Sequence, residues 1–436
     1  IAVIRANKNF SIEEFINRFG LSTDEGIAIM CLAESLLRIP DLQTSKEFVS
    51  DKLSNKSWES FLFMKSKSFK TVFSSFGIYF SGKFTDIVKS DNVLAKLIDR
   101  FGQPVFLKTL RQAIMYLSKS FVFAENIKAA LEKKQEFLGY RFAFDLLGES
   151  ARTKKQSEKY YKDYINAIEC ISKTFNVKED AICDITSRPN LSVKLTALYP
   201  RFEYPKLHDI RQELMPKIIN LIEKIKESNL TITFDAEESF RLDAYISFLS
   251  EVIEQPILKD FNGIGLVVQA YQTRSYSLIE QIILLAKKTN KKISIRLVKG
   301  AYWDSEIKHA QVNGLAYYPV FTKKEYTDAN YIACARLILE NNDYIYPQFA
   351  THNALTISTI MELVGTKSHE FQKLYGMGDA LHAQLVNNTS NVRIYAPVGK
   401  SDDLLAYLMR RLLENGANSN FVSKVISSEV PLSDLS

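Results

Sequence analysis

The chain has 436 residues, of which 46% are hydrophobic and 24% charged, with 16 glycines, 11 prolines and a net charge of +6. This composition excludes a disordered or fibrous protein, and the length allows one large α/β domain beside a smaller accessory region. The excess of positive charge is compatible with an anionic ligand or a membrane surface, but it is too small to indicate nucleic-acid binding. Because the sequence has no signal peptide and no apolar run near 18 residues, we expect a soluble chain, or at most one peripheral to a membrane.

The four cysteines, Cys31, Cys170, Cys183 and Cys334, lie far apart and form no CxxC pair. This spacing favours buried thiols in a reducing cytosol over disulfides. The five histidines are isolated and no HExxH motif occurs, so we expect no metal site. The chain begins at Ile1 rather than at a methionine, which predicts that it is a piece of a longer protein.

The first 137 residues have the pattern of helices. Ser22 and Glu25 resemble a capping box ahead of apolar residues at helical spacing, and the segment Ile39–Asp41 ends that helix. The basic and aromatic segment at 56–70, KSWESFLFMKSKSFK, is typical of a helix with one buried stripe. Contact with nucleic acid is the alternative for this segment.

Eight short runs rich in β-branched and aromatic residues follow residue 138, with amphipathic segments between most of them. The runs are YRFAFDLLGES (140–150), NLSVKL (190–195), LTITFDAEES (230–239), GIGLVVQAY (263–271), ISIRLVKG (293–300), YPQFATHN (346–353), EFQKLYGM (370–377) and NVRIYAPVG (391–399). They predict an α/β fold, a (βα)8 TIM-like barrel with its active site at the C-terminal ends of the strands. A doubly wound sheet is the alternative, but no GxGxxG opens a helix and no P-loop occurs. The segment at 317–331, YYPVFTKKEYTDANY, is predicted to be a rim loop that covers a ligand.

Polar and charged residues gather where these runs end, whereas the strand interiors are predicted to be apolar. They are Asp145, Glu149, Lys194, Asp235, Glu237, Glu238, Gln269, Arg296, Lys299, Thr351, His352, Asn353, Gln372 and Tyr395. In the stretch RLVKGAYWD (296–304), Gly300 allows a close approach of backbone to a ligand, and Tyr302 and Trp303 offer flat walls for a ring. This mixture of cations, amides and hydroxyls suits a large polyanionic ligand such as a dinucleotide.

A second signal lies in LLAYLMRRLLENGAN (404–418), where Arg410 and Arg411 stand side by side in an otherwise apolar helix. Glu414 lies four residues after Arg410 and three after Arg411, so an exposed ion-pair cluster is one interpretation. Because apolar residues flank both sides, we favour a carboxylate-binding role.

Together these blocks resemble the proline dehydrogenase part of the bacterial bifunctional proline utilisation flavoproteins. The blocks, in the order of that family, are LSTDEGIAIMCLAESLLRIPD, FDLLGES, SVKLTALYPRFE, FDAEES, GLVVQAYQ, RLVKGAYWDSEIKHAQ, YPVFTKK with TDANY, YPQFATHN, EFQKLYGMG, RIYAPVG and LMRRLLENGAN. The resemblance covers the chain from about Leu21 to Val422.

The resemblance implies a helical arm and accessory domain over residues 1–137, a (βα)8 FAD-binding barrel over 138–422, and a linker over 423–436 towards a C-terminal aldehyde dehydrogenase module. It implies oxidation of L-proline to Δ1-pyrroline-5-carboxylate by hydride transfer from proline C5 to FAD N5, the first step of proline catabolism. Electrons would pass to a membrane quinone. It further implies a cytoplasmic protein that attaches peripherally to the inner face of the cytoplasmic membrane.

Carried over position by position, the resemblance implies that Lys194, Arg410 and Arg411 pair with the proline carboxylate. Tyr395 packs against the substrate ring, and Leu374, Ala301 and Tyr302 form parts of the pocket wall. Arg296 matches the arginine near flavin N5, while Asp235 and Ala236 line the flavin ring. The other positions that match FAD contacts are Val267, Gln269, Val298, Lys299, Gly300, Ala301, Trp303, Phe321, Thr322, Thr351, His352, Asn353, Gln372, Arg411, Glu414 and Phe421.

The sequence departs from the family at Asn420, where a small serine is more usual. The family's ribbon-helix-helix segment is not recognised, so no nucleic-acid partner is expected. Three alternatives stay open: a regulatory DNA-binding module, a barrel that acts only as an interaction scaffold, and the same chemistry on hydroxyproline or a larger cyclic imino acid.

Overall fold

The computed structural model describes residues 41, 43, 44, 47, 121–175, 184–387 and 390–399. The chain divides into two compact units, one made of Ile1–Phe121 and Ser401–Ser436 and the other of Val122–Lys400. The second unit contains the barrel and is the one considered below. The predicted boundaries at residues 138 and 422 stay predictions.

The second unit is built on a closed barrel of eight parallel strands that follow one another in chain order. The strands are β1 (Tyr140–Leu146), β2 (Asn190–Val193), β3 (Thr231–Phe234), β4 (Ile264–Gln269), β5 (Ile293–Val298), β6 (Ile345–Ala350), β7 (Glu370–Leu374) and β8 (Val392–Val398). β8 pairs with β1 from Tyr140 opposite Val392 to Leu146 opposite Val398, which closes the ring. The predicted (βα)8 fold is therefore confirmed.

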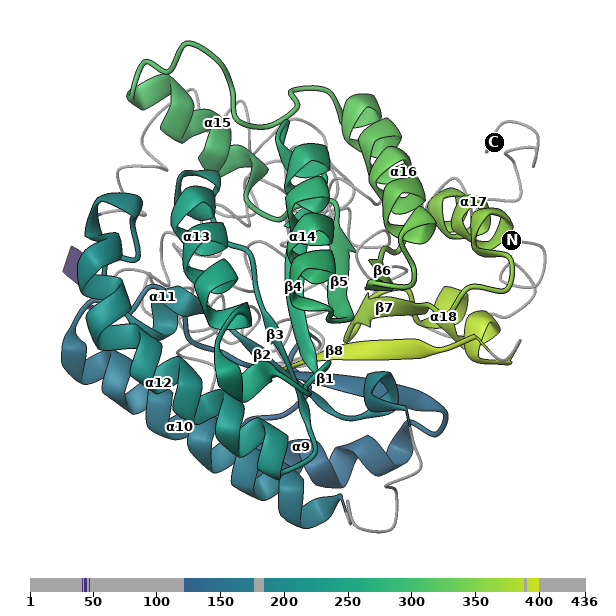
Figure 1. Ribbon diagram of the computed structural model, residues 1–436, viewed down its shortest axis with the longest axis horizontal. Helices are drawn as coiled ribbons and strands as arrows, with labels where there is room; N and C mark the ends of the chain where they lie inside the picture. The colour runs from purple at the N-terminus through teal and green to yellow at the C-terminus, as the bar shows by residue number, and fades with distance from the viewer. Residues whose placement is uncertain are drawn as a thin grey trace, which may run out of the picture. The chain divides into compact units, whose positions relative to one another are not determined.

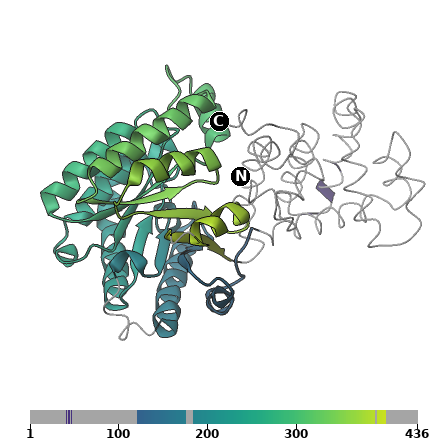
Figure 2. The same cartoon turned by 90° about the vertical axis from the view of Figure 1, so that its right-hand side faces the viewer.

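Helices cover the outside of the strands (Figures 1 and 2). They are α9 (Ile127–Lys133), α10 (Lys154–Thr174), α11 (Leu195–Leu198), α12 (Leu207–Glu227), α13 (Leu242–Ile253), α14 (Ser275–Thr289), α15 (Trp303–Val312), α16 (Lys324–Glu340), α17 (Ala354–Val364) and α18 (Asp379–Asn387). Their starts follow from capping: Thr153 accepts a hydrogen bond from the Gln156 amide at the start of α10, and Asn353 accepts one from the Thr356 amide at the start of α17.

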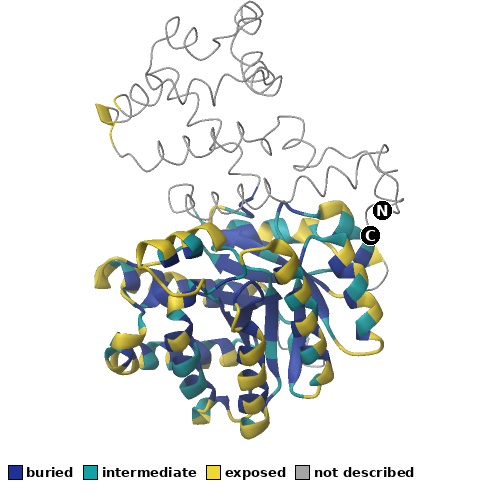
Figure 3. Ribbon diagram, turned by 90° about the horizontal axis from the view of Figure 1, so that it is seen from above, coloured by how far each residue is buried: buried dark blue, intermediate teal, exposed yellow. Residues whose placement is uncertain are grey.

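The core lies between the helices and the strands, where the long helices bury one stripe each (Figure 3). On α12 this stripe includes Ile210, Leu214, Ile218 and Leu221, which recur at the helical period. No helix within the described part of the chain is long and apolar enough to cross a membrane.

The predicted rim loop at 317–331 is only partly a loop, because α16 begins at Lys324. Thr327 and Tyr331 lie one turn apart and are buried, and the Tyr331 hydroxyl donates a hydrogen bond to the carbonyl oxygen of Leu297 on β5, 3.1 Å away. Their inward packing fixes this stretch as helix. Residues 317–323 alone remain available as a rim loop.

Candidate active site

Most of the predicted site residues lie at or near the C-terminal ends of the strands. On the strands themselves lie Val267 and Gln269 (β4), Arg296 and Val298 (β5), Gln372 and Leu374 (β7) and Tyr395 (β8). After the strands come Asp235 and Ala236 (β3), Lys299–Trp303 (β5) and Thr351–Asn353 (β6). Phe321 and Thr322 precede α16. Lys194 follows β2 directly. Arg410, Arg411, Glu414 and Phe421 lie outside the described residues.

Five strands and the residues that follow them bring four charged side chains and a tyrosine together inside the mouth of the barrel. Lys194 Nζ lies 2.5 Å from Asp145 Oδ1 and 3.4 Å from Asp235 Oδ2. Asp235 also accepts hydrogen bonds from Arg296 Nη1 at 2.7 Å and from the Tyr395 hydroxyl at 2.6 Å. The Arg296 guanidinium lies 5.0 Å from the centre of the Tyr395 ring. We call Asp145, Lys194, Asp235, Arg296 and Tyr395 the mouth cluster.

Burial sets the electrostatics of the mouth cluster. Burial raises the pKa of Asp145, although Lys194 acts in the opposite direction. For Lys194, burial works to lower the pKa, but Asp145, Tyr395 and Asp235 outweigh it and raise that pKa well above its usual value. Burial also raises the pKa of the Tyr395 phenol well above its usual value, with help from Asp145 and Asp235. Lys194 is therefore a permanent cation, and Tyr395 is a neutral hydrogen-bond donor.

A second buried acid, Glu237, ties neighbouring strand ends together. Its carboxyl group accepts hydrogen bonds from the hydroxyl of Thr196 and, at 3.3 Å, from the Thr196 amide. The Thr196 hydroxyl accepts a bond from the Ser150 amide at 2.9 Å, and the Gln269 side-chain amide donates to the Glu237 carbonyl oxygen at 2.7 Å. The segments after β1, β2 and β3 and the end of β4 are thereby joined, and this fixes the turn that carries Lys194.

The segment after β5 is shaped for close contact. Gly300 has a φ of +135°, and a Cβ atom there would stand 2.4 Å from the Tyr271 ring. Lys299 forms an ion pair with Asp328 on α16, which also pairs with Lys324. Only glycine fits at position 300, because the backbone packs against the Tyr271 ring; the predicted approach to a ligand stays a prediction.

The ends of β6 and β7 are joined by His352. Its Nε2 atom accepts a hydrogen bond from the Leu374 amide at 3.0 Å, while Asn353 caps α17. No group of histidine, cysteine, aspartate and glutamate side chains suited to a metal ion occurs within the ranges that the structure covers.

The barrel interior contradicts the prediction of apolar strand interiors. Glu370 on β7 and Arg393 on β8 are almost fully buried, and Arg393 Nε lies 2.7 Å from Glu370 Oε1. Arg141 Nη1 approaches Glu370 Oε2 to 3.1 Å, and the amides of Gln348 and Gln372 donate to Oε1 at 2.9 and 2.8 Å. The sequence signal was available, because a lone glutamate and a lone arginine in two consecutive apolar runs are tolerated inside a barrel only as a pair.

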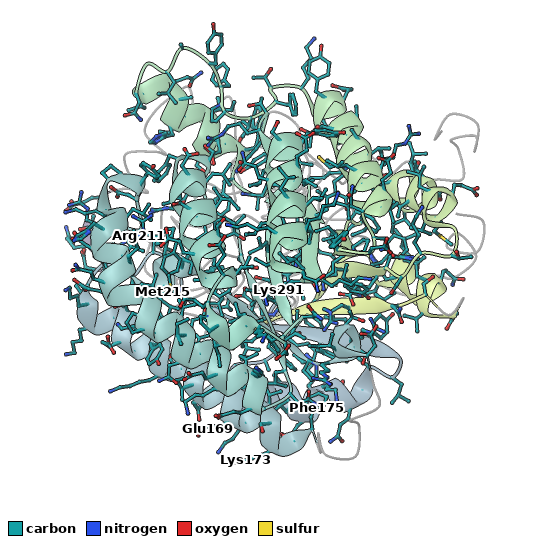
Figure 4. The ribbon with its side chains drawn as sticks, in the orientation of Figure 1. Glu169, Lys173, Phe175, Arg211, Met215 and Lys291 are labelled. Carbon is teal, nitrogen blue, oxygen red and sulfur yellow. The ribbon has the colours of Figure 1, made fainter. Side chains whose placement is uncertain are left out.

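Cations at the N-terminal end of the barrel serve the fold. Lys291, labelled in Figure 4, precedes β5 and donates to the carbonyl oxygen of Leu258. Arg393 likewise donates to the carbonyl oxygens of Phe142 and Arg188, each 2.9 Å away. In (βα)8 barrels generally, residues at the N-terminal face stabilise the fold, and residues at the C-terminal face form the active site.

Several buried polar atoms in the barrel find no hydrogen-bond partner among the described residues. They are Oδ2 of Asp145, Nε of Arg296 and the Oε1 atoms of Gln348 and Gln372. Since most buried polar atoms in folded proteins are paired, these atoms mark where ordered water or a bound molecule completes the structure. As one donor and three acceptors, they fit a molecule that both accepts and donates hydrogen bonds.

Comparison with known proteins gives two matching family models. A model described as "Proline dehydrogenase" matches residues 127–424, and one described as "DNA-binding domain of Proline dehydrogenase" matches residues 11–121. The second match runs against our expectation that the chain has no nucleic-acid partner. The residues of this second match are almost all outside the described ranges.

The chain is similar to bifunctional PutA proteins. It is 40% identical to that of Klebsiella aerogenes over 97% of this chain and 33% of the relative, and 40% identical to that of Escherichia coli over 99% and 34%. A crystal structure of a Bradyrhizobium japonicum proline utilization A mutant has a TM-score of 0.72 and 41% identity, covering 99% of this chain and 44% of that chain.

A shorter relative, proline dehydrogenase 1 of Bacillus subtilis, is 27% identical over 71% of this chain and 90% of its own length. The chain thus spans about a third of the length of the PutA relatives. The resemblance read from the sequence blocks is confirmed. With its barrel matched over its whole length, the chain belongs to the proline dehydrogenase family of oxidoreductases.

Proposed function

We propose that this chain oxidises L-proline to Δ1-pyrroline-5-carboxylate with bound FAD, and that the electrons pass on to a membrane quinone. The observation that carries the proposal is the mouth cluster, in which a permanent cation, Lys194, lies beside the ion pair of Asp235 and Arg296. Such a site holds a small carboxylate in a fixed orientation. The family match supplies the substrate class.

The residues present fit FAD on structural grounds. Arg296 Nε, a donor, and Gln372 Oε1, an acceptor, have no hydrogen-bond partner among the described residues, and the polar flavin ring would supply both an acceptor and a donor. Gln269, Lys299, Trp303, Thr351 and Asn353 are the side chains proposed to hold it along the rim. FAD supplies a ring that accepts two electrons from the carbon next to the substrate nitrogen.

The protein's own residues then bind and orient the substrate. Lys194 keeps its proton, so it acts as an electrostatic anchor for the carboxylate and not as a base. Because the Tyr395 hydroxyl is committed to Asp235, its ring is held in one orientation as a wall beside the substrate ring. Arg296 is fixed by Asp235 and by the Ser192 hydroxyl at 3.0 Å, so its positive charge is preorganised where negative charge develops.

The bifunctional relatives support a longer whole protein. We propose that the chain is the proline dehydrogenase part of a longer bifunctional protein in which an aldehyde dehydrogenase module consumes the product. We also propose that it works in the cytoplasm, at the inner face of the membrane that holds the quinone.

A spectrum tests the central proposal. The purified chain should be yellow, and anaerobic L-proline should bleach the flavin absorbance. Lys194→Met should raise the KM for proline by ~10- to 150-fold, because a hydrogen bond to a charged group contributes roughly 1.5–3 kcal/mol. Lys154→Met, which breaks an exposed pair with Glu213, is the matched control and should leave the KM unchanged. Colourless protein that FAD does not reconstitute would contradict the proposal.

The match of residues 11–121 favours a second function, binding to duplex DNA. A gel-shift titration at moderate salt tests it with the full chain. A shift that weakens as salt rises would support DNA binding, since phosphate contacts release counterions. Free DNA at micromolar protein would refute it.

A further inference from the structure

Asp145 is the most deeply buried member of the mouth cluster. It lies near the end of β1, opposite Ser192 on β2, and it has no exposed surface. Its Oδ1 atom accepts a hydrogen bond from Lys194 Nζ at 2.5 Å, whereas its Oδ2 atom has no hydrogen-bond partner among the described residues. One side chain, Lys194, thus compensates a carboxylate that has no access to water.

The ions of the mouth cluster balance one another. Asp145 and Asp235 carry two negative charges, and Lys194 and Arg296 carry two positive charges, within ion-pair distances of 2.5, 3.4 and 2.7 Å. A carboxylate that comes to Lys194 must share an ammonium group already engaged with two aspartates. It also brings a negative charge close to Asp145, where the low dielectric makes an uncompensated charge expensive.

We propose that Asp145 takes up a proton from solvent when a substrate carboxylate engages Lys194, so that Asp145 is a positioning residue whose protonation releases Lys194 to the substrate. The inference rests on the proposed function, because it assigns the carboxylate subsite to Lys194. The balance is simple: Asp145 gains one proton, Lys194 keeps its own, and the total charge of the cluster with the carboxylate bound is again zero.

The surroundings of Asp145 favour this exchange. Burial, the largest influence, raises its pKa, and Asp235 at the end of β3 acts in the same direction, while Lys194 and Tyr395 oppose them. Arg296 on β5 faces Asp235, and the Tyr164 hydroxyl on α10 accepts a hydrogen bond from the Lys194 amide at 3.3 Å. Once Lys194 turns to the substrate carboxylate, its lowering effect on the pKa of Asp145 weakens, and protonation of Asp145 follows.

Calorimetry on the full FAD-loaded chain tests the exchange without turnover. The probe is cyclopentanecarboxylate, the carbocyclic counterpart of proline, which has no ring nitrogen to be oxidised or to titrate. Titrations at one pH in phosphate and in Tris, which differ in ionisation enthalpy, give the number of protons taken up on binding. We expect close to one proton, and a Kd that rises about tenfold per pH unit above neutrality.

Two variants separate the proposal from its alternatives. Asp145→Asn should abolish proton uptake and make the Kd independent of pH over the same range. Glu213→Gln removes a carboxylate that pairs with the exposed Lys154, and it should keep the wild-type slope. If Asp145→Asn does not fold, the wild-type titration still tests the exchange, because binding without proton uptake would overturn it.

The outcomes are distinct. Binding of cyclopentanecarboxylate with no proton uptake would overturn the proposal and leave the proposed function standing. Proton uptake that persists in Asp145→Asn would overturn the assignment to Asp145. Absence of binding at millimolar cyclopentanecarboxylate, with the flavin present, would overturn both the carboxylate subsite and the exchange.

Discussion

Glu237 makes the stability of the barrel depend on pH in a way that one substitution can isolate. Burial raises the pKa of this carboxyl group from 4.5 to about 8; Thr196 opposes the shift, and Glu238 and Glu149 add to it. The folded protein therefore holds a proton that the unfolded chain releases above its ordinary pKa. The contribution of Glu237 to the free energy of unfolding therefore falls as pH rises from about 4.5 to about 8, and it is constant above pH 8.

The size of the effect follows from the shift. The limiting slope is about 1.4 kcal/mol per pH unit, so Glu237 alone should remove roughly 3 kcal/mol between pH 5 and pH 7.5. A glutamine side chain mimics the protonated acid and cannot ionise, so Glu237→Gln should show no such loss. At pH 5 the variant should lie within about 1 kcal/mol of the wild type, because it alters one hydrogen bond to Thr196.

Thermal unfolding of both proteins from pH 5 to pH 9 measures the difference. The wild-type Tm minus the variant Tm should fall by roughly 6–12 °C between pH 5 and pH 7.5, since 1 kcal/mol moves Tm by about 2–4 °C in domains near this size. All other titrating groups cancel in this difference. Glu213→Gln, which removes an exposed carboxylate paired with Lys154, is the matched control. Parallel curves for the wild type and Glu237→Gln would refute the reasoning.

Three further predictions concern the barrel and the carboxylate subsite. Glu370→Gln should lower the free energy of unfolding by about 3–5 kcal/mol in denaturant titrations, because it leaves Arg393 buried without its counter-ion. A loss below about 1 kcal/mol would show that the pair is dispensable. Gly300→Ala should lower the free energy of unfolding by about 2 kcal/mol or more, because the new Cβ atom clashes with the Tyr271 ring. Gly314→Ala, whose Cβ atom would have nothing within 4 Å, should lower it by about 1 kcal/mol. Equal losses would contradict the close approach. Arg411→Met should raise the KM for proline by ~10- to 150-fold in steady-state assays. A rise of less than about threefold would show that this arginine belongs only to an exposed ion pair.

The sequence predicted the barrel because its eight runs are short, apolar and regularly separated by amphipathic segments. Strand ends could also be placed together, since the C-terminal ends of parallel strands meet at one face of a barrel. Asp145, Lys194 and Asp235 come from three different runs, and the structure joins them through one ammonium group. The pairing itself was not predictable, because side-chain direction and distance depend on the closed geometry.

The errors have physical causes as well. The segment 317–331 was predicted to be a rim loop, but Tyr331 packs inward from α16 and bonds to β5, a long-range contact that the local sequence does not show. Glu370 and Arg393 each stand alone in an apolar run, which signals that each needs a buried partner, but the runs alone do not show the distance between the two side chains. Register decides this: Gln372 lies opposite Arg393, which sets the arginine beside the β7 side chains that face the barrel interior.

The two buried ionic sets differ in how completely they are satisfied, and this difference separates structure from chemistry. Glu370 accepts hydrogen bonds from Arg141, Arg393, Gln348 and Gln372, and ion pairs with the two arginines hold its pKa below the usual value although burial acts to raise it. The Glu370 carboxylate itself therefore has no unsatisfied oxygen. In the mouth cluster Asp145 keeps one oxygen without a partner in the described chain, and one ammonium group serves two carboxylates. A buried set that is neutral but incompletely bonded can exchange partners at small cost, so the mouth of the barrel, and not its floor, is where a charged substrate can enter.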